Sequence, residues 1–267
     1  MVDAVRAEDI ELAHELASLA AQAALPYAGG TVRHRFKRDG SPVSEADLAA
    51  EGAMLEVLRD RRPRDGVISE EAGQVATGRR QWLLDPIDGT VQFVSGGPEW
   101  GTHVALEEDG EIVLGVITRP LVQRRWWAAR GHGAFSSTDT DPLTYTTSLS
   151  VTTTSDLASA TVGLYRPDDS KVPHVLAAHN ASTVTHGSPI LDLVEGRIDA
   201  VVSDRCGFAW DHAPAVILAI ESGGRFTDPR GGVRADLQGG LYSNGHLHDE
   251  LQDLLTAASI DLAGDLT

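Results

Sequence analysis

The chain of 267 residues contains one cysteine, Cys206, so no disulfide can form within it. A lone thiol fits a reducing compartment better than a secreted protein. No run of residues approaches the roughly 18 uncharged apolar positions that indicate a membrane-spanning helix. The N-terminal segment carries Glu8, Asp9 and Glu11 among its apolar residues, unlike the basic and then apolar layout of a secretory signal peptide. The sequence therefore predicts a cytoplasmic protein.

Basic residues are scarce as well, with 22 Lys and Arg against 39 Asp and Glu, a formal net charge of −17. Such an acidic balance opposes binding to nucleic acid or to an anionic membrane surface, so we expect neither as a partner. Most of these acids are expected to solubilise the surface. The sharper alternative is that a few of them are gathered to hold cations.

Several catalytic signatures are missing. The chain has no Gly-x-Ser-x-Gly, Walker loop, His-Glu-x-x-His or paired-cysteine motif, which argues against serine hydrolases and zinc proteases. No twelve-residue loop has the alternating acids and glycine of an EF-hand calcium site. The ten histidines, His103 and His212 among them, are scattered, and each is predicted to be a surface or core residue rather than a ligand.

Hydrophobic periodicity predicts helices first and antiparallel strands next. A helical apolar stripe covers residues 10–23, and Ser44 to Asp47 resembles a capping box that opens a helix to Leu58. Antiparallel strands are expected at 103–106, 112–118 and 126–129. Further strands are expected at 149–152, 160–164 and 198–202, and further helices at 172–178, 190–195, 213–221 and 249–257. This order predicts an α+β fold, one compact unit whose halves are 1–137 and 138–267.

The segment Trp82 to Thr90 is the most informative part of the sequence. Asp85 and Asp88 lie three residues apart beyond an apolar strand, and Gly89 allows a tight turn there. The two aspartates and the carbonyl of Ile87 could supply three of the oxygen ligands that Mg²⁺ prefers. Alternatively, both aspartates only form Asx turns or cap a helix.

Three further acids lie at the ends of predicted elements. Glu70 follows the short strand 66–69, and it would meet Asp85 if the two strands are neighbours in one sheet. Asp211 opens a predicted helix, and Asp47 lies in the first turn of another. Taken singly, each of these acids is as well explained as a solvated residue or a helix cap.

Thr90 comes directly after Gly89 at a predicted helix start. Free backbone N–H groups and the positive end of the helix dipole favour a phosphate at such a position. The Thr90 hydroxyl could in addition orient a water molecule. The segment thus combines candidate metal ligands with a candidate phosphate site.

These segments resemble the inositol monophosphatase superfamily of Mg²⁺-dependent, lithium-sensitive phosphatases. Three motifs occur in the family's order: Ser69-Glu70-Glu71, Asp85-Pro86-Ile87-Asp88-Gly89-Thr90, and Trp210-Asp211 leading to Glu221-Ser222-Gly223-Gly224. With supporting matches that begin at Ser41, the resemblance covers most of the chain to Gly224. It implies an αβαβα layered sandwich, usually a homodimer, with two or three Mg²⁺ ions per active site.

The resemblance also implies a role for each motif residue. It implies three metal positions: Glu70, Asp85 and the Ile87 carbonyl; Asp85, Asp88 and Asp211; and Glu70 with waters. It implies that Asp47 and Thr90 position the attacking water, and that the amides of Gly89 and Thr90 hold the phosphate. Such metals lower the pKa of water and neutralise the leaving alkoxide, so no covalent nucleophile is needed.

Residues 124–131 look like those of actinobacterial histidinol-phosphate phosphatases in this superfamily, which implies an amino-alcohol phosphate. The expected substrate contacts are Ser188, Asp204 and Asp211. In His186-Gly187-Ser188, however, Ser188 replaces the acid expected to meet the ammonium group, and a buried ammonium without a carboxylate is poorly satisfied. Inositol 1-phosphate and sugar or nucleoside monophosphates stay open as substrates. A catalytically silent metal- or phosphate-binding module is the alternative outside the enzymes.

Overall fold

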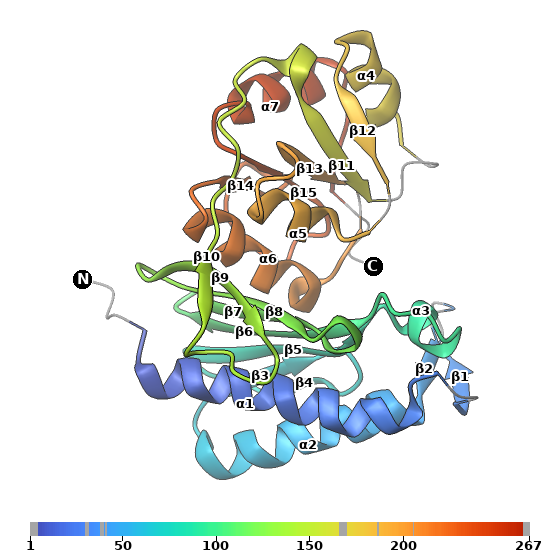
Figure 1. The fold of residues 1–267 in the computed structure, drawn as a ribbon, viewed down its shortest axis with the longest axis vertical. Helices are drawn as coiled ribbons and strands as arrows, with labels where there is room; N and C mark the ends of the chain where they lie inside the picture. Colours follow the sequence, from blue (N-terminus) through green and yellow to red (C-terminus); the bar gives the residue numbers. More distant parts are fainter. Residues whose placement is uncertain are drawn as a thin grey trace.

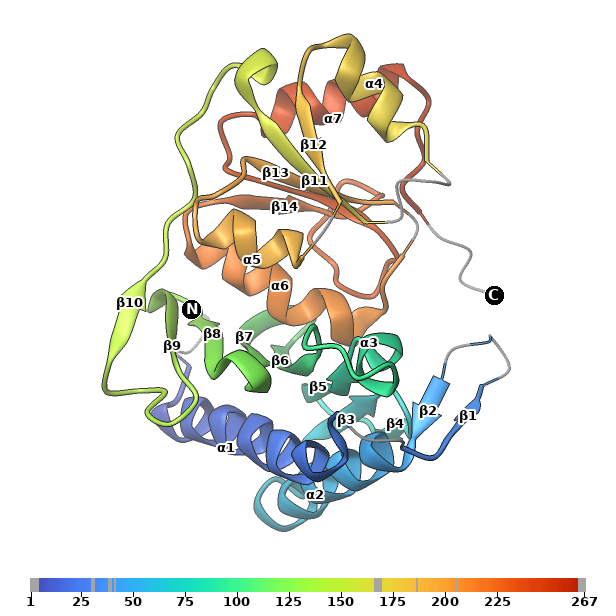
Figure 2. The ribbon, with the colours of Figure 1, turned by 45° about the vertical axis from the view of Figure 1, so that its right-hand side comes forward.

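The structure, a computed structural model, describes residues 5–29, 32–37, 40, 42–165, 170–185, 187–204 and 206–263. Its elements form five layers: a helix pair, a large sheet, central helices, a small sheet and outer helices (Figures 1 and 2). The αβαβα sandwich that the motifs implied is therefore confirmed. None of the described helices is long and apolar enough to cross a membrane.

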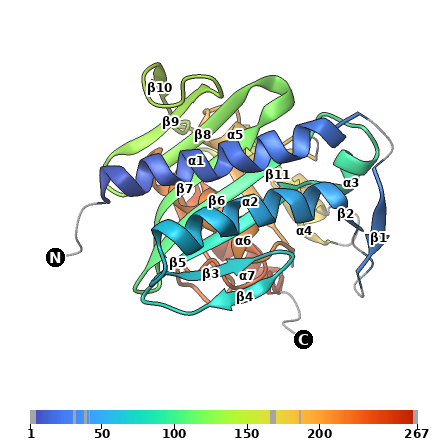
Figure 3. The same ribbon diagram turned by 90° about the horizontal axis from the view of Figure 1, so that it is seen from below.

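Two long helices form the first layer and lie side by side across one face of the large sheet (Figure 3). They are α1 (Ala7–Ala24) and α2 (Glu45–Arg61). The predicted capping box is present, because the Ser44 hydroxyl accepts hydrogen bonds from the first turn of α2 while Asp47 accepts one from the Ser44 backbone at 2.7 Å. The short 3₁₀ turn η1 (Leu25–Tyr27) and the hairpin β1 (His34–Phe36) and β2 (Pro42–Ser44) connect the two helices.

The large sheet contains the predicted meander, and its strands run in the order β10-β9-β8-β7-β6-β5-β3-β4. Their bounds are β3 (Gly66–Ser69), β4 (Gly73–Ala76), β5 (Arg80–Asp88), β6 (Gly101–Glu108), β7 (Glu111–Arg119), β8 (Arg124–Ala129), β9 (Gly133–Thr138) and β10 (Thr146–Ser148). Among the described strands of this sheet, β3 and β5 are the pair that runs parallel, and the other pairs are antiparallel. The 3₁₀ turn η2 (Pro120–Val122) links β7 to β8.

The prediction of a strand at residues 149–152 is wrong. The strand lies earlier, as β10, and pairs with β9, so the large sheet extends beyond residue 137. Residues 149–154 instead cross to the second sheet as extended chain, where Leu149 and Val151 pack against the central core and the Val151 amide donates to the Ser222 carbonyl. The division into halves at 137 and 138 stays a prediction.

Side chains of the central strands alternate between the two faces of the large sheet. Leu84 faces α1 and α2, whereas Leu83 and Ala105 face the central helices. Asp85 follows Leu83 by two residues and His103 precedes Ala105 by two. Both polar side chains therefore belong to the face that is covered by the central helices.

The second half builds the small sheet and the helices on its two faces. The strand order is β12-β11-β13-β15-β14, with β11 (Thr161–Tyr165), β12 (Ser182–Val184), β13 (Ala200–Ser203), β14 (Arg225–Thr227) and β15 (Gly240–Ser243). The central helices are α5 (Pro189–Val194) and α6 (Ala209–Glu221), and the outer helices are α4 (Val172–Ala178) and α7 (His248–Ala257). The 3₁₀ turn η3 (Leu157–Ser159) precedes β11.

Close packing holds α6 against the large sheet. A side chain at Gly115 of β7 would bring its Cβ within 2.7 Å of Ile217, so this crossing requires glycine. At the C-terminal end of α6, the Glu221 carboxylate accepts hydrogen bonds from the amides of Gly131 and Gly133 at 2.9 and 2.8 Å. These contacts fix the helix whose first turn reaches the end of β5.

Candidate metal and phosphate site

The ends of β3 and β5 bring the first two carboxylates together. Because the two strands are parallel with Ser69 beside Leu84, Glu70 follows β3 at the level where Asp85 follows Leu84. The expected turn after Asp85 is instead a bulged continuation of β5, with the register shift between Asp85 and Asp88. Since a bulge redirects the side chains that follow it, Asp88 also reaches the site.

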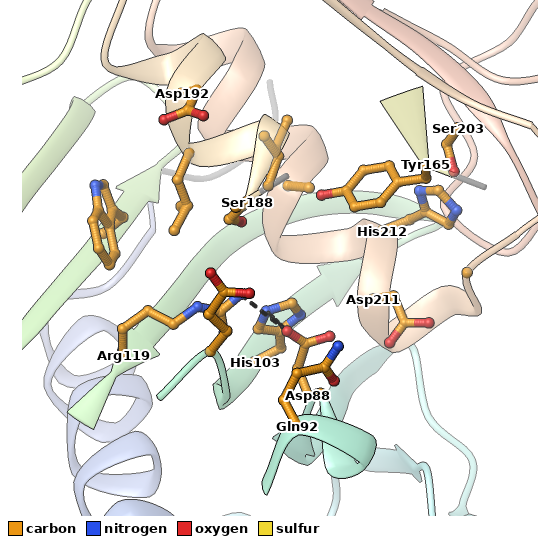
Figure 4. Close-up of a pocket in the computed structure, with 18 of the residues that line it drawn as sticks. Asp88, Gln92, His103, Arg119, Tyr165, Ser188, Asp192, Ser203, Asp211 and His212 are labelled. Atoms are coloured by element: carbon orange, nitrogen blue, oxygen red, sulfur yellow. Dashed lines mark hydrogen bonds and ion pairs between the residues drawn. The ribbon is translucent and has the colours of Figure 1, made fainter. Parts of the chain in front are cut away.

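Helix α6 supplies a further carboxylate, Asp211. Asp211 lies in its first turn, where one carboxylate oxygen accepts the Phe208 amide at 2.7 Å. Asp85, Asp88, His103 and Asp211 each offer one donor atom, and these four atoms lie within 4.8 Å of one another. Figure 4 shows Asp88, His103 and Asp211 around one space. Three of the predicted metal ligands thus converge from two separate parts of the chain.

The carboxylates repel one another in a buried setting. Burial raises the pKa of Asp85 well above its usual range, and the charges of Glu70, Asp211 and Asp88 raise it further. Burial and then the charge of Asp88 raise the pKa of Asp211 to about 7. One oxygen of Asp85, Oδ1, has no hydrogen-bond partner among the described residues. A cation would supply the missing partner and remove the repulsion.

Lys37 faces the two glutamates at the edge of this cluster. Its ammonium lies 2.8 Å from Glu70 and 2.7 Å from Glu71. Burial raises the pKa of Glu71 to about 7 despite the lysine. Glu70 is therefore beside the cluster, with a positive partner from the segment after β1.

Two residues that were not predicted to belong to the site, His103 and Arg119, contact Asp88. The Arg119 guanidinium lies 3.1 Å and the His103 Nε2 3.4 Å from the same oxygen, Oδ2. Burial opposes the charge of Asp88, but these two neighbours outweigh burial, so the pKa of Asp88 is lowered. Burial lowers the pKa of His103 to about 4, which leaves its ring neutral at pH 7.

Thr90 lies beside Asp47. The Thr90 hydroxyl lies 3.4 Å from Asp47 Oδ1 and 3.1 Å from the Ile87 carbonyl oxygen, and it can donate its one hydrogen to either. The other oxygen of Asp47 accepts from the amide and hydroxyl of Ser44. The wholly buried Asp47 is thus held rigidly at the start of α2.

Gly89 connects the cluster to the helix α3 (Thr90–Val94). Its φ of +83° lies in the left-handed region, and a Cβ there would approach the Glu99 carbonyl oxygen to 2.7 Å. Glycine is therefore required for the turn that places Thr90 beside Asp88.

A cavity of about 810 Å³ opens beside the cluster. Ser188 and Asp211 line it, together with Asp192, which lies one helical turn after Ser188 (Figure 4). Asp192 accepts a hydrogen bond from Arg197 at 2.7 Å. Asp204, the third expected substrate contact, is buried. The described residues that line this cavity do not include it. Ser41 and His186 lie outside the described residues.

Known proteins resemble the chain over nearly its whole length. Residues 2–261 match the Inositol monophosphatase family. A Streptomyces griseus protein named glucose-1-phosphate thymidylyltransferase is 46% identical over 92% of this chain and 96% of its own. A Streptomyces coelicolor histidinol-phosphatase is 35% identical over 91% and 95%. The solved structure of a Thermotoga maritima IMPase covers 96% of this chain and 100% of its own, with a TM-score of 0.79 and 24% identity.

Proposed function

Because the chain belongs to the inositol monophosphatase family, we propose that it hydrolyses a small-molecule phosphate monoester using two or three bound Mg²⁺ ions. One observation carries the proposal: Asp85, Asp88 and Asp211 converge beside the Thr90 turn at the wall of a large cavity. Hard divalent cations prefer such oxygen donors. The buried Oδ1 of Asp85, which has no hydrogen-bond partner among the described residues, also suits a cation ligand.

The proposed ligand sets follow the motifs. They are Glu70, Asp85 and the Ile87 carbonyl for one ion, Asp85, Asp88 and Asp211 for a second, and Glu70 with waters for a third. Bound there, the cations would lower the pKa of a water molecule and neutralise charge on the phosphate and the leaving oxygen. Lys37 would have to release Glu70, because its ammonium lies 2.8 Å from that carboxylate.

Asp47 and Thr90 would orient the attacking water. The Thr90 hydroxyl has one hydrogen and two acceptors, so a cation on the Ile87 carbonyl would leave that hydrogen to Asp47. The hydroxyl oxygen could then accept a hydrogen from the water and direct a lone pair of the water at phosphorus. The amides of Gly89 and Thr90 would hold the phosphate at the start of α3.

Histidinol phosphate is the candidate substrate that the histidinol-phosphatase relative suggests. The cavity also favours a second candidate class, neutral phosphorylated polyols. Ser188 offers no charge to an ammonium group, and Asp192 is already paired with Arg197. Inositol 1-phosphate and sugar or nucleoside monophosphates are therefore the rival substrates. The name of the Streptomyces griseus relative, glucose-1-phosphate thymidylyltransferase, is that of an enzyme that acts on a sugar phosphate.

Phosphate release from these monophosphates, with and without Mg²⁺, tests the reaction class. Asp88→Asn should abolish Mg²⁺-dependent release, whereas Asp253→Asn, at an exposed position of α7, should leave it unchanged. If the folded protein binds Mg²⁺ but turns over none of the monophosphates, it is a silent binding module and the proposal is wrong.

The ratio of kcat/KM values tests the substrate class. If Ser188 marks a lost ammonium contact, histidinol phosphate should be a poor substrate and Ser188→Asp should improve it, because a carboxylate then faces the ammonium. Ser188→Asn is the matched uncharged control and should not improve it. A high kcat/KM for histidinol phosphate in the unmodified protein contradicts this reasoning.

We also propose that the protein is a cytoplasmic homodimer, as the motifs and the single cysteine led us to expect. Light scattering during size-exclusion chromatography tests the oligomeric state: a mass of twice 28.4 kDa supports a dimer. Fractionation of cells that express the protein tests its location.

A further inference from the structure

His103 is a buried histidine whose ring nitrogens form no hydrogen bond with the described residues, although Nε2 lies 3.4 Å from Asp88 Oδ2. The residue is 6% exposed. In His212, which lines the same cavity, both ring nitrogens are bonded, to the Tyr242 hydroxyl at 2.6 Å and to the Cys206 carbonyl at 2.9 Å. Burying a polar group without a hydrogen-bond partner costs free energy. The lack of hydrogen bonds at the ring nitrogens of His103 therefore requires an explanation.

The strand register aims His103 at the carboxylates. His103 of β6 is the direct cross-strand partner of Asp85 of β5, and both side chains lie on the face covered by α6. A donor atom of His103 lies within 4.8 Å of donor oxygens of Asp85, Asp88 and Asp211. Donors on opposite sides of a cation that is about 2.1 Å from each are about 4.2 Å apart, so one cation could bridge this group after a small movement.

We propose that His103 is a direct ligand of the cation held by Asp85, Asp88 and Asp211, and that this position prefers Mn²⁺ or Co²⁺ to Mg²⁺. The inference rests on the proposed function only for the existence of that metal position. Imidazole nitrogen suits first-row transition cations, whereas Mg²⁺ favours oxygen donors and keeps its waters. A nitrogen among three carboxylates therefore shifts the selectivity of the site.

Arg119 contacts the proposed metal ligand Asp88. Its guanidinium donates a hydrogen bond to Asp88 Oδ2 at 3.1 Å and so orients this carboxylate. Outer partners of this kind fix the direction of a ligand. The competing explanation is that His103 only donates a hydrogen bond to Asp88 once the site is filled, which would make it a positioning residue.

Pulsed electron paramagnetic resonance on metal-stripped protein reloaded with Mn²⁺ alone distinguishes the two. A directly bound imidazole gives ¹⁴N hyperfine coupling to Mn²⁺, which an outer histidine does not. We expect this coupling in the unmodified protein and in His212→Asn, the matched control from the same cavity, and expect its loss in His103→Ser. An unmodified protein that binds Mn²⁺ without ¹⁴N coupling, or that does not bind Mn²⁺, overturns the proposal without recourse to any variant.

Calorimetric titrations with Mn²⁺ and with Mg²⁺ measure the metal selectivity of the site. His103→Ser should weaken Mn²⁺ binding by about 10-fold or more and Mg²⁺ binding by less than about 3-fold. Equal losses for both ions contradict the proposal. Because neither measurement needs a substrate, the two proposals fail separately: ¹⁴N coupling without turnover of any monophosphate leaves the ligand assignment standing, and turnover without coupling leaves the phosphatase standing.

Discussion

Replacing Asp211 with Asn should stabilise the metal-free protein, although it removes a proposed metal ligand. Burial and the charge of Asp88 raise the pKa of Asp211 to about 7 in the fold, from 3.8 for the free side chain. An acid with a raised pKa resists ionisation in the folded state, so it costs no stability below about pH 4. The cost grows as the pH rises through the interval up to about 7 and is constant above it.

The size of this effect follows from the shift. About three pKa units at 1.36 kcal/mol each give about 4 kcal/mol at pH 8, of which about 1.5 kcal/mol is already present at pH 5. About 2.5 kcal/mol should therefore separate the two pH values, or about 5 to 10 °C in Tm for a chain of this length. Asn should keep the helix cap, since its amide oxygen can still accept the Phe208 amide, now at 2.7 Å from the carboxylate.

Thermal unfolding of chelator-treated protein at pH 5 and pH 8 measures the effect. Asp211→Asn should raise Tm much more at pH 8 than at pH 5, while the exposed Asp253→Asn should change it little at either pH. Saturating Mg²⁺ should then reverse the order at pH 8, because a cation that binds only the folded state adds stability and the variant binds it less well. An equal effect of Asp211→Asn at both pH values would refute the electrostatic reasoning.

Three other changes test separate parts of the structure. Gly89→Ala should reduce kcat by about 10-fold or more while the circular dichroism spectrum stays normal. The φ of +83° disfavours alanine, and the new Cβ would lie 2.7 Å from the Glu99 carbonyl oxygen, so the turn is displaced. Unchanged kinetics contradict this reasoning. Thr90→Ser should retain more kcat than the isosteric Thr90→Val, which cannot donate to Asp47. Arg125→Met should lower the urea unfolding free energy by about 3 to 5 kcal/mol without changing KM, because the buried guanidinium holds Asp139 at 3.0 Å.

The layers of the fold could be predicted wherever the signal is local. The capping box at Ser44 and the antiparallel strands expected at 103–106 and 112–118 each depend on neighbouring residues, and all are present. The strand expected at 149–152 failed because its apolar residues pack into the central core from extended chain, and only distant elements decide that no strand pairs there. Local pattern cannot separate a strand from a buried crossing.

The carboxylate site was predictable because its members stand at the ends of elements, which sheet geometry collects at one edge. His103 and Arg119 were not predicted as site residues. They reach Asp88 because their strands, β6 and β7, pair beside β5, and the local sequence does not show this pairing. Once the partner of β5 is known, the register places His103 opposite Asp85. The alternation along 103–106 was a usable signal, since it puts His103 and Ala105 on one face.

Without a cation, the carboxylate site lowers the stability of the folded protein, because negative charges from the large sheet and from helix α6 meet in it. Asp85 and Asp88 belong to the large sheet, and Asp211 belongs to the helix between the sheets. Helix α6 is held against the large sheet by its close packing on Gly115 and by the hydrogen bonds of Glu221, none of which involves the carboxylates of the site. The charges therefore cannot relax by separation. Cation binding must act mainly by lowering the free energy of a preformed cluster, so metal affinity and folding stability are linked through the same carboxylates.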